Sequence, residues 1–95
     1  MPTLFLLFGF RFFYRLYDLV NEPLHVHVSD NSRKLCKFWI YSDGSVQLAD
    51  NVGFNKRELT RIEKALVEHR DKISQTYESD CKANGVTPNY KRKGR

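Results

Sequence analysis

The chain has 95 residues, enough for one domain whose core needs no metal or disulfide for support. Its apolar fraction of 41% and charged fraction of 28% are ordinary for a globular protein. The net charge of +5 does not lie on the body of the chain. Residues 1–80 hold eleven basic and eleven acidic residues, and residues 81–95 hold five basic residues and no acid, so the excess is confined to the C-terminal end.

Five strands are predicted from runs of β-branched and aromatic residues with a period of two. In chain order they are Thr3–Phe8, Phe10–Tyr17, His25–Ser29, Leu35–Tyr41 and Val46–Ala49. The connections are short, and Asp43-Gly44 is a strong hairpin signal, so the sheet should be largely antiparallel. Within Leu35–Tyr41, alternation separates Cys36, Phe38 and Ile40 from Lys37, Trp39 and Tyr41, with one set facing the core.

A helix is expected from Lys56 to about Ser79, with Asn55 as its N-cap and Glu58 completing a capping box. Its apolar stripe consists of Leu59, Ile62, Leu66, Ile73 and Tyr77. Such a helix would be ~36 Å long, so it either projects past the sheet or breaks. The predicted fold class is α+β, an antiparallel sheet of four to five strands with one long C-terminal helix packed on it. Residues 1–80 would form the domain and residues 81–95 a basic, flexible tail.

Two histidines, His25 and His27, stand one residue apart after Pro23, on a predicted strand. Residues i and i+2 of a strand point to the same side, so the two imidazoles should form a pair. One interpretation is a pair of half-buried histidines without chemistry. A second is a catalytic pair, one base and one acid, acting on a phosphodiester beside Arg11 or Arg15. A third is a site for a divalent metal such as zinc, whose third ligand would come from Asp18, Glu22, Asp30 or His69.

Basic and aromatic side chains alternate on two predicted strands, around Phe13 and Trp39. Such a surface suits single-stranded RNA, whose bases stack and whose phosphates pair with cations. The candidate nucleic-acid-binding residues are Arg11, Arg15 and Lys37 on the strands and Lys91, Arg92 and Lys93 in the tail. The alternative is an outer sheet face with snorkelling cations, and a tail that only adds solubility.

The two cysteines, Cys36 and Cys81, are far apart and form no metal-ligand pair, so we expect reduced thiols with Cys36 in the core. His69 lies along the apolar stripe of the helix and is expected to be a core or interface residue. The apolar segment Thr3–Phe10 is too short to cross a bilayer and has neither the basic start nor the cleavage site of a signal peptide. A cytoplasmic protein without membrane contact is therefore expected.

The order of motifs is itself familiar. It runs from Met1-Pro2-Thr3 through Gly9–Phe13, Asn21–Val28, Lys37-Phe38-Trp39, Val46–Leu48 and Gly53-Phe54 to Glu58-Leu59. This order resembles the small prokaryotic domain-of-unknown-function family 4160 over about residues 1–79. Members carry an N-P-P-H-x-H-V-like motif and end in a helix. This chain departs from the pattern in having Leu24 for the second proline, Leu19-Val20 in the turn, and the basic tail.

The resemblance implies a partner more than an activity. Members of the family are often encoded beside a second small protein, in an arrangement similar to a toxin–antitoxin pair. By position, the family motif singles out His25 and His27, with Pro23 to position them. We therefore expect a cytoplasmic protein-interaction module of toxin–antitoxin type, with a cognate small protein as partner, added nucleic-acid contact and no cofactor. The alternatives are a ribonuclease-like toxin using the two histidines, a metal-binding structural protein, and a homo-oligomer. Whether the protein is an enzyme is left open.

Overall fold

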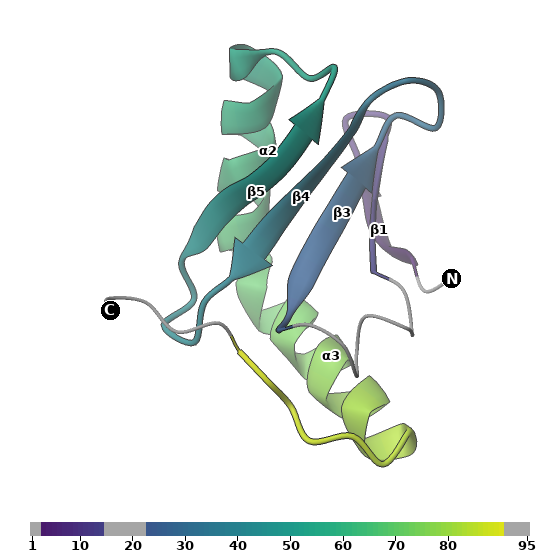
Figure 1. The fold of residues 1–95 in the computed structure, drawn as a ribbon, viewed down its shortest axis with the longest axis vertical. Coiled ribbons are helices and arrows are strands. Elements are labelled where there is room, and N and C mark those ends of the chain that lie inside the picture. Colours follow the sequence, from purple (N-terminus) through teal and green to yellow (C-terminus); the bar gives the residue numbers. More distant parts are fainter. Residues whose placement is uncertain (1–2, 15–22, 91–95) are drawn as a thin grey trace.

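The computed structural model describes residues 3–14 and 23–90 (Figure 1). Its elements are β1 (Thr3–Leu7), β2 (Phe10–Phe13), β3 (His25–Ser29), β4 (Leu35–Ile40), β5 (Val46–Val52), α2 (Lys56–Glu68) and α3 (Arg70–Ala83). The strands form one sheet in the order of the chain, and each pair of neighbours is antiparallel. The predicted antiparallel α+β fold is confirmed. Residues 15–17 of the predicted second strand lie outside the described residues.

The two faces of the sheet differ as the alternation predicts. Phe12 pairs with Val28, and Val28 pairs with Cys36, so these three side chains share one face. That face is covered by α2, which lies behind the sheet in Figure 1, and α3 adds Ile73, Tyr77 and Cys81 to the same core. Cys36 and the core residues that follow it in β4 point inward, while Lys37 and Trp39 point to the opposite face. We call this opposite face, the one that faces away from α2 and α3, the open face.

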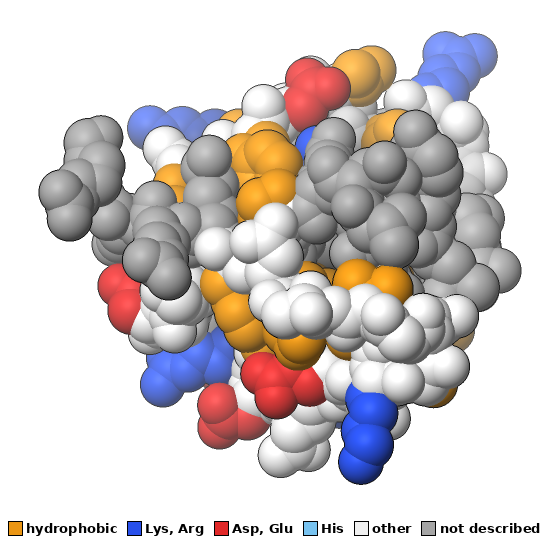
Figure 2. Space-filling model, turned by 60° about the horizontal axis from the view of Figure 1, so that its bottom comes forward, with side chains coloured by type: hydrophobic (Ala, Val, Ile, Leu, Met, Phe, Trp, Pro, Cys, Tyr) orange, Lys and Arg blue, Asp and Glu red, His pale blue; other side chains and the backbone are white. Residues whose placement is uncertain are grey.

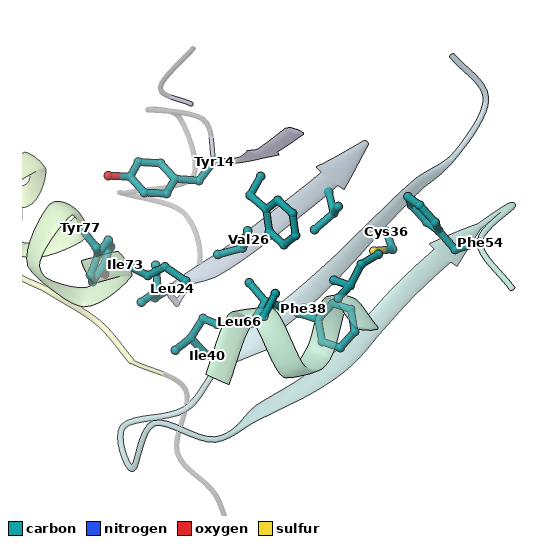
Figure 3. Packing of buried hydrophobic residues seen from close by; sticks show 14 of the residues in the cluster. Tyr14, Leu24, Val26, Cys36, Phe38, Ile40, Phe54, Leu66, Ile73 and Tyr77 are labelled. Carbon is teal, nitrogen blue, oxygen red and sulfur yellow. The ribbon is translucent and has the colours of Figure 1, made fainter. Parts of the chain in front are cut away.

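The core lies between the sheet and the helices (Figure 3). The predicted helical stripe is correct, because Ile62, Leu66, Ile73 and Tyr77 are buried within 1% exposure, and Leu59 packs against the cluster. From the sheet, the core takes Phe12, Val26, Val28, Cys36, Phe38 and Ile40, and Tyr14 and Leu24 join it from just outside β2 and β3. A helix stripe of period 3.6 and a strand face of period two therefore meet in one apolar layer.

The expectation of one long helix is wrong, since the helix ends at Glu68 and a second begins at Arg70. His69 stands between them with φ −104° and ψ 14°. The hydrogen bonds from His69 N to Ala65 O and from Ile73 N to His69 O persist at 3.0 Å, so the chain bends without unwinding. Past the bend, α3 runs beyond the ends of the strands (Figure 1), where the Tyr77 ring meets the Tyr14 ring edge-on with centroids 6.5 Å apart. No proline or glycine marks it, and the His69 ring packs on Phe5 of β1 with centroids 4.8 Å apart.

The β4–β5 connection is the predicted Asp-Gly hairpin. Tyr41 N donates to Ser45 O at 2.8 Å, and Gly44 N donates to Tyr41 O at 3.0 Å. Gly44 has φ +88°, in the left-handed region that favours glycine, and a Cβ there would lie 2.7 Å from Cδ of Arg70. The turn thus touches the first residue of α3, which helps to fix where the second helix begins.

The start of α2 carries the predicted capping box. Asn55 Oδ1 accepts from Glu58 N at 2.8 Å, and Glu58 Oε1 accepts from Asn55 N at 3.0 Å. Lys34 also binds the Glu58 carboxylate, with Nζ 2.8 Å from Oε2, and this contact holds the pKa of Glu58 below its ordinary value. The box therefore ties the helix to the β3–β4 connection as well as starting it.

Residues 81–90, which were expected to belong to a tail, continue α3 to Ala83 and then return along the domain. Asn89 O accepts from Leu24 N at 2.9 Å, and the Tyr77 hydroxyl bonds both Asn89 O and Asn89 N, at 3.0 and 2.7 Å. Cys81 is fully buried. Figure 2 shows the end of the molecule toward which α3 runs, where hydrophobic side chains are visible among polar and charged ones. Lys91, Arg92 and Lys93 lie outside the described residues.

Both cysteines are free and buried, which makes a test of the core possible. Burial raises the pKa of the Cys36 thiol to about 12, and burial also raises the pKa of Cys81. A folded pKa above the unfolded value of about 8.5 favours the protonated thiol in the native state. The resulting stabilisation is complete below pH ~8.5 and is lost as the pH rises toward 12. We expect a thiol reagent at pH 8 to modify neither cysteine in the native protein and both in urea. A thiol that reacts rapidly without urea would contradict this packing.

Among the described residues, neither helix is long and apolar enough to span a membrane.

Candidate interaction surface

The two histidines lie side by side on β3, and both point to the open face. His25 is paired with Trp39 and His27 with Lys37 on β4, while His27 is paired with Phe13 on β2. The imidazole centroids are 4.9 Å apart, with the rings nearly perpendicular. The strand geometry therefore brings together the pair that the sequence singles out, on the side of the sheet away from the helices.

The histidines are nonetheless buried, with 2% of His25 and 8% of His27 exposed. His25 Nδ1 lies 2.9 Å from the backbone oxygen of Pro23. A carbonyl oxygen only accepts, so His25 carries a proton on Nδ1, and the lone pair of the neutral ring is on Nε2. The backbone oxygen of Pro23 thus orients the first imidazole.

Aromatic rings and cations form a continuous row across three strands. Phe13 stacks on His27 at 5.4 Å between centroids, and His25 meets Trp39 edge-on at 5.6 Å. Each end of the row has a cation over a ring. Arg11 Cζ lies 4.3 Å from the centre of Phe13, and Lys37 Nζ lies 4.4 Å from the centre of Trp39. We call this set of six residues the ring row.

Three exposed apolar side chains stand on one cross-strand line of the open face, which meets the ring row at Arg11. Register pairs Leu6 with Arg11, Arg11 with Ser29, Ser29 with Leu35, and Leu35 with Val52. Cross-strand partners share a face, so this line runs over all five strands. Leu6 is 67% exposed, Leu35 38% and Val52 57%. We call these three residues the apolar strip.

The predicted site residues are only partly brought together. Arg11 and Lys37 stand at the two ends of the ring row, close to His25 and His27. Arg15 and the three tail residues lie outside the described residues. The apolar strip was not predicted, because its members come from three separate strands and only the register aligns them.

One of the alternatives from the sequence is a metal site at the histidine pair. Among the described residues there is no group of three His, Cys, Asp or Glu side chains that could hold a metal ion. His69 packs against Phe5 of β1, a strand that pairs with β2 and not with β3. Asp18 and Glu22 lie outside the described residues. In the described part of the chain, the histidine pair therefore supplies only two of the ligands that a zinc site needs.

The protein is therefore a small α+β protein with helices on one face of its sheet. The other face carries aromatic rings, cations and exposed apolar side chains. A family model described as "Domain of unknown function (DUF4160)" matches residues 9–78. That is more than half of the chain, so the protein belongs to this family. The match includes both histidines and the cations of the ring row, and it ends before the returning segment. Neither a search of curated proteins nor a search of solved structures found a match.

Proposed function

We propose that the protein is a binding module of toxin–antitoxin type, whose open face binds a small cognate protein encoded beside it. The apolar strip is the observation that carries the proposal. In a sheet with one face in the core, the other face is normally polar. Here that face exposes Leu6, Leu35 and Val52 in one line, and aligned exposed apolar residues are typical of a binding surface.

The burial of the histidine pair also favours binding over catalysis. A catalytic imidazole must reach the proton that it moves, within hydrogen-bond distance of the substrate. With 2% and 8% exposure, His25 and His27 support the neighbouring rings and cations of the surface.

The edge strands of the sheet are poorly suited to pairing with a strand of a partner, which favours binding on the open face. The β1–β2 register shifts between Thr3 and Phe5, and the β4–β5 register shifts at the step from Lys37 to Phe38. Such bulges bend an edge strand and discourage another strand from pairing with it. Since β1 and β5 are the two edges, a partner is better received on the open face.

A cytoplasmic location belongs to the same proposal. The two cysteines are buried free thiols. Thiols stay reduced in the cytoplasm, so free cysteines are consistent with a cytoplasmic location.

The test is a co-purification with a matched control. We expect Leu35→Asp or Leu6→Asp to weaken binding of the neighbouring gene's product about 10- to 100-fold, because a buried carboxylate would replace an apolar contact. Val67→Asp is the control, since Val67 on α2 is 36% exposed, close to the 38% of Leu35, and lies on the helix side. Equal binding by all three variants would refute the open face as the interface. A wild-type protein that does not bind the neighbour would refute the proposal altogether.

A ribonuclease is the second candidate, and the hydrogen bond between His25 and Pro23 is what favours it. That bond leaves Nε2 as the basic nitrogen, as a general base requires. The candidate predicts that the wild-type protein cleaves RNA, with or without zinc or manganese. Absence of cleavage under all of these conditions would exclude it.

A further inference from the structure

Arg11 has a buried guanidinium nitrogen without a hydrogen-bond acceptor among the described residues. Its Nε is shielded from solvent and makes no hydrogen bond to the described residues. The guanidinium lies on the Phe13 ring, which is itself 3% exposed. Lys34, by contrast, has the Glu58 carboxylate at 2.8 Å. The Phe13 ring thus holds Arg11 in position, and the described residues offer its Nε no acceptor.

Such an arrangement favours an anionic group from outside. A polar group that is taken out of water without a partner costs free energy, and a bound acceptor would recover it. The planar guanidinium matches carboxylates and phosphates, to which it can donate two parallel hydrogen bonds. An arginine supported by an aromatic ring is also a frequent centre of binding energy in protein interfaces.

We infer that Arg11 binds a carboxylate of the partner protein, within an acidic segment that also places apolar side chains on the apolar strip. This inference rests on the proposed function and names the chemistry of the partner. Leu6 is the cross-strand neighbour of Arg11, and Leu35 is two strands further along the same line. A segment that places an acidic side chain on Arg11 therefore meets exposed leucine on both sides.

The surroundings favour a protein over a nucleic acid. A phosphate would suit the guanidinium equally well, but a sugar–phosphate backbone gains little from Leu6 and Leu35. Base stacking needs an open ring, and Phe13 is buried beneath Arg11.

The experiment measures the affinity of the neighbouring gene's product for Arg11→Gln and Arg11→Glu at two salt concentrations. We expect Arg11→Gln to weaken binding about 10-fold and Arg11→Glu about 100-fold, with a smaller salt dependence than wild type. Lys64→Glu on α2 makes the same charge change as Arg11→Glu on an exposed residue of the helix side, and should leave the affinity unchanged. Thermal midpoints of all variants check that each is folded. A fluorescent oligouridylate serves as the second probe.

Each other outcome has one meaning. If the partner binds wild type and both Arg11 variants equally, the inference is overturned while the proposed function stands. If Arg11→Glu abolishes oligouridylate binding but not partner binding, Arg11 serves a phosphate and the inference is overturned. If the partner does not bind wild type at all, the proposed function is overturned, and this inference with it.

Discussion

Replacing Phe38 by alanine is expected to lower the free energy of unfolding by about 3–5 kcal/mol, the usual cost of emptying a phenylalanine site in a core. The Phe38 ring is 1% exposed and packs between the sheet and the helices (Figure 3). Domains of this size are stable by only about 5–15 kcal/mol, so the variant should be partly unfolded under mild denaturant. Urea denaturation followed by circular dichroism measures the change.

The control for Phe38 is its own cross-strand partner, Leu48 on β5. Leu48 is 40% exposed, so Leu48→Ala should cost less than about 1.5 kcal/mol. A similar loss for both variants would mean that the helices do not cover the sheet as described.

Replacing His25 by alanine is expected to cost about 2–4 kcal/mol. The change removes a ring packed against His27 and Trp39, and it leaves the Pro23 oxygen without its donor. The loss should appear as a lower thermal midpoint, whatever activity the protein has. This expectation separates a structural histidine from a catalytic one.

The companion variant His25→Asn retains the donor, because the asparagine amide nitrogen takes nearly the place of Nδ1. It should recover part of the stability that His25→Ala loses. If His25→Ala instead keeps the wild-type midpoint but abolishes an RNA-cleaving activity, the structural role is wrong and the ribonuclease gains support.

Local patterns predicted much of this fold. Alternation separated Cys36, Phe38 and Ile40 from Lys37 and Trp39, although Tyr41, which the pattern groups with the latter, is buried. The His25-Val26-His27 spacing placed both imidazoles on one side. Asp43-Gly44 predicted the hairpin, and Asn55 with Glu58 predicted the start of α2. Each of these features depends on a few residues that are close together in the chain, so it can be predicted from the sequence.

Features that depend on distant contacts were not predictable. The break at His69 has no glycine or proline signal, and contacts with Phe5 and the Gly44 turn accompany it. The returning segment is held by Leu24 and Tyr77, far away in the chain.

The candidate surface shows the same division. Alternation within each strand predicts that Arg11 and Lys37 point away from the core. Only the pairing of β2, β3 and β4 shows that they lie at the two ends of one row. The apolar strip requires the register of all five strands, and a shift of one residue would have buried Leu6 and Leu35. The histidine motif thus becomes the middle of a larger surface whose outer parts are the exposed ones.

We propose that the open face, and not the helix face, binds the partner. Amide chemical shifts of the isotope-labelled protein, recorded by NMR with and without the neighbouring gene's product, test it most directly. If the partner binds the open face, the shift changes concentrate at Leu6, Arg11, Leu35 and Val52, while the amides of α2 around Lys64 stay unchanged. Shifts concentrated along α2, with β2 to β4 unaffected, would contradict it.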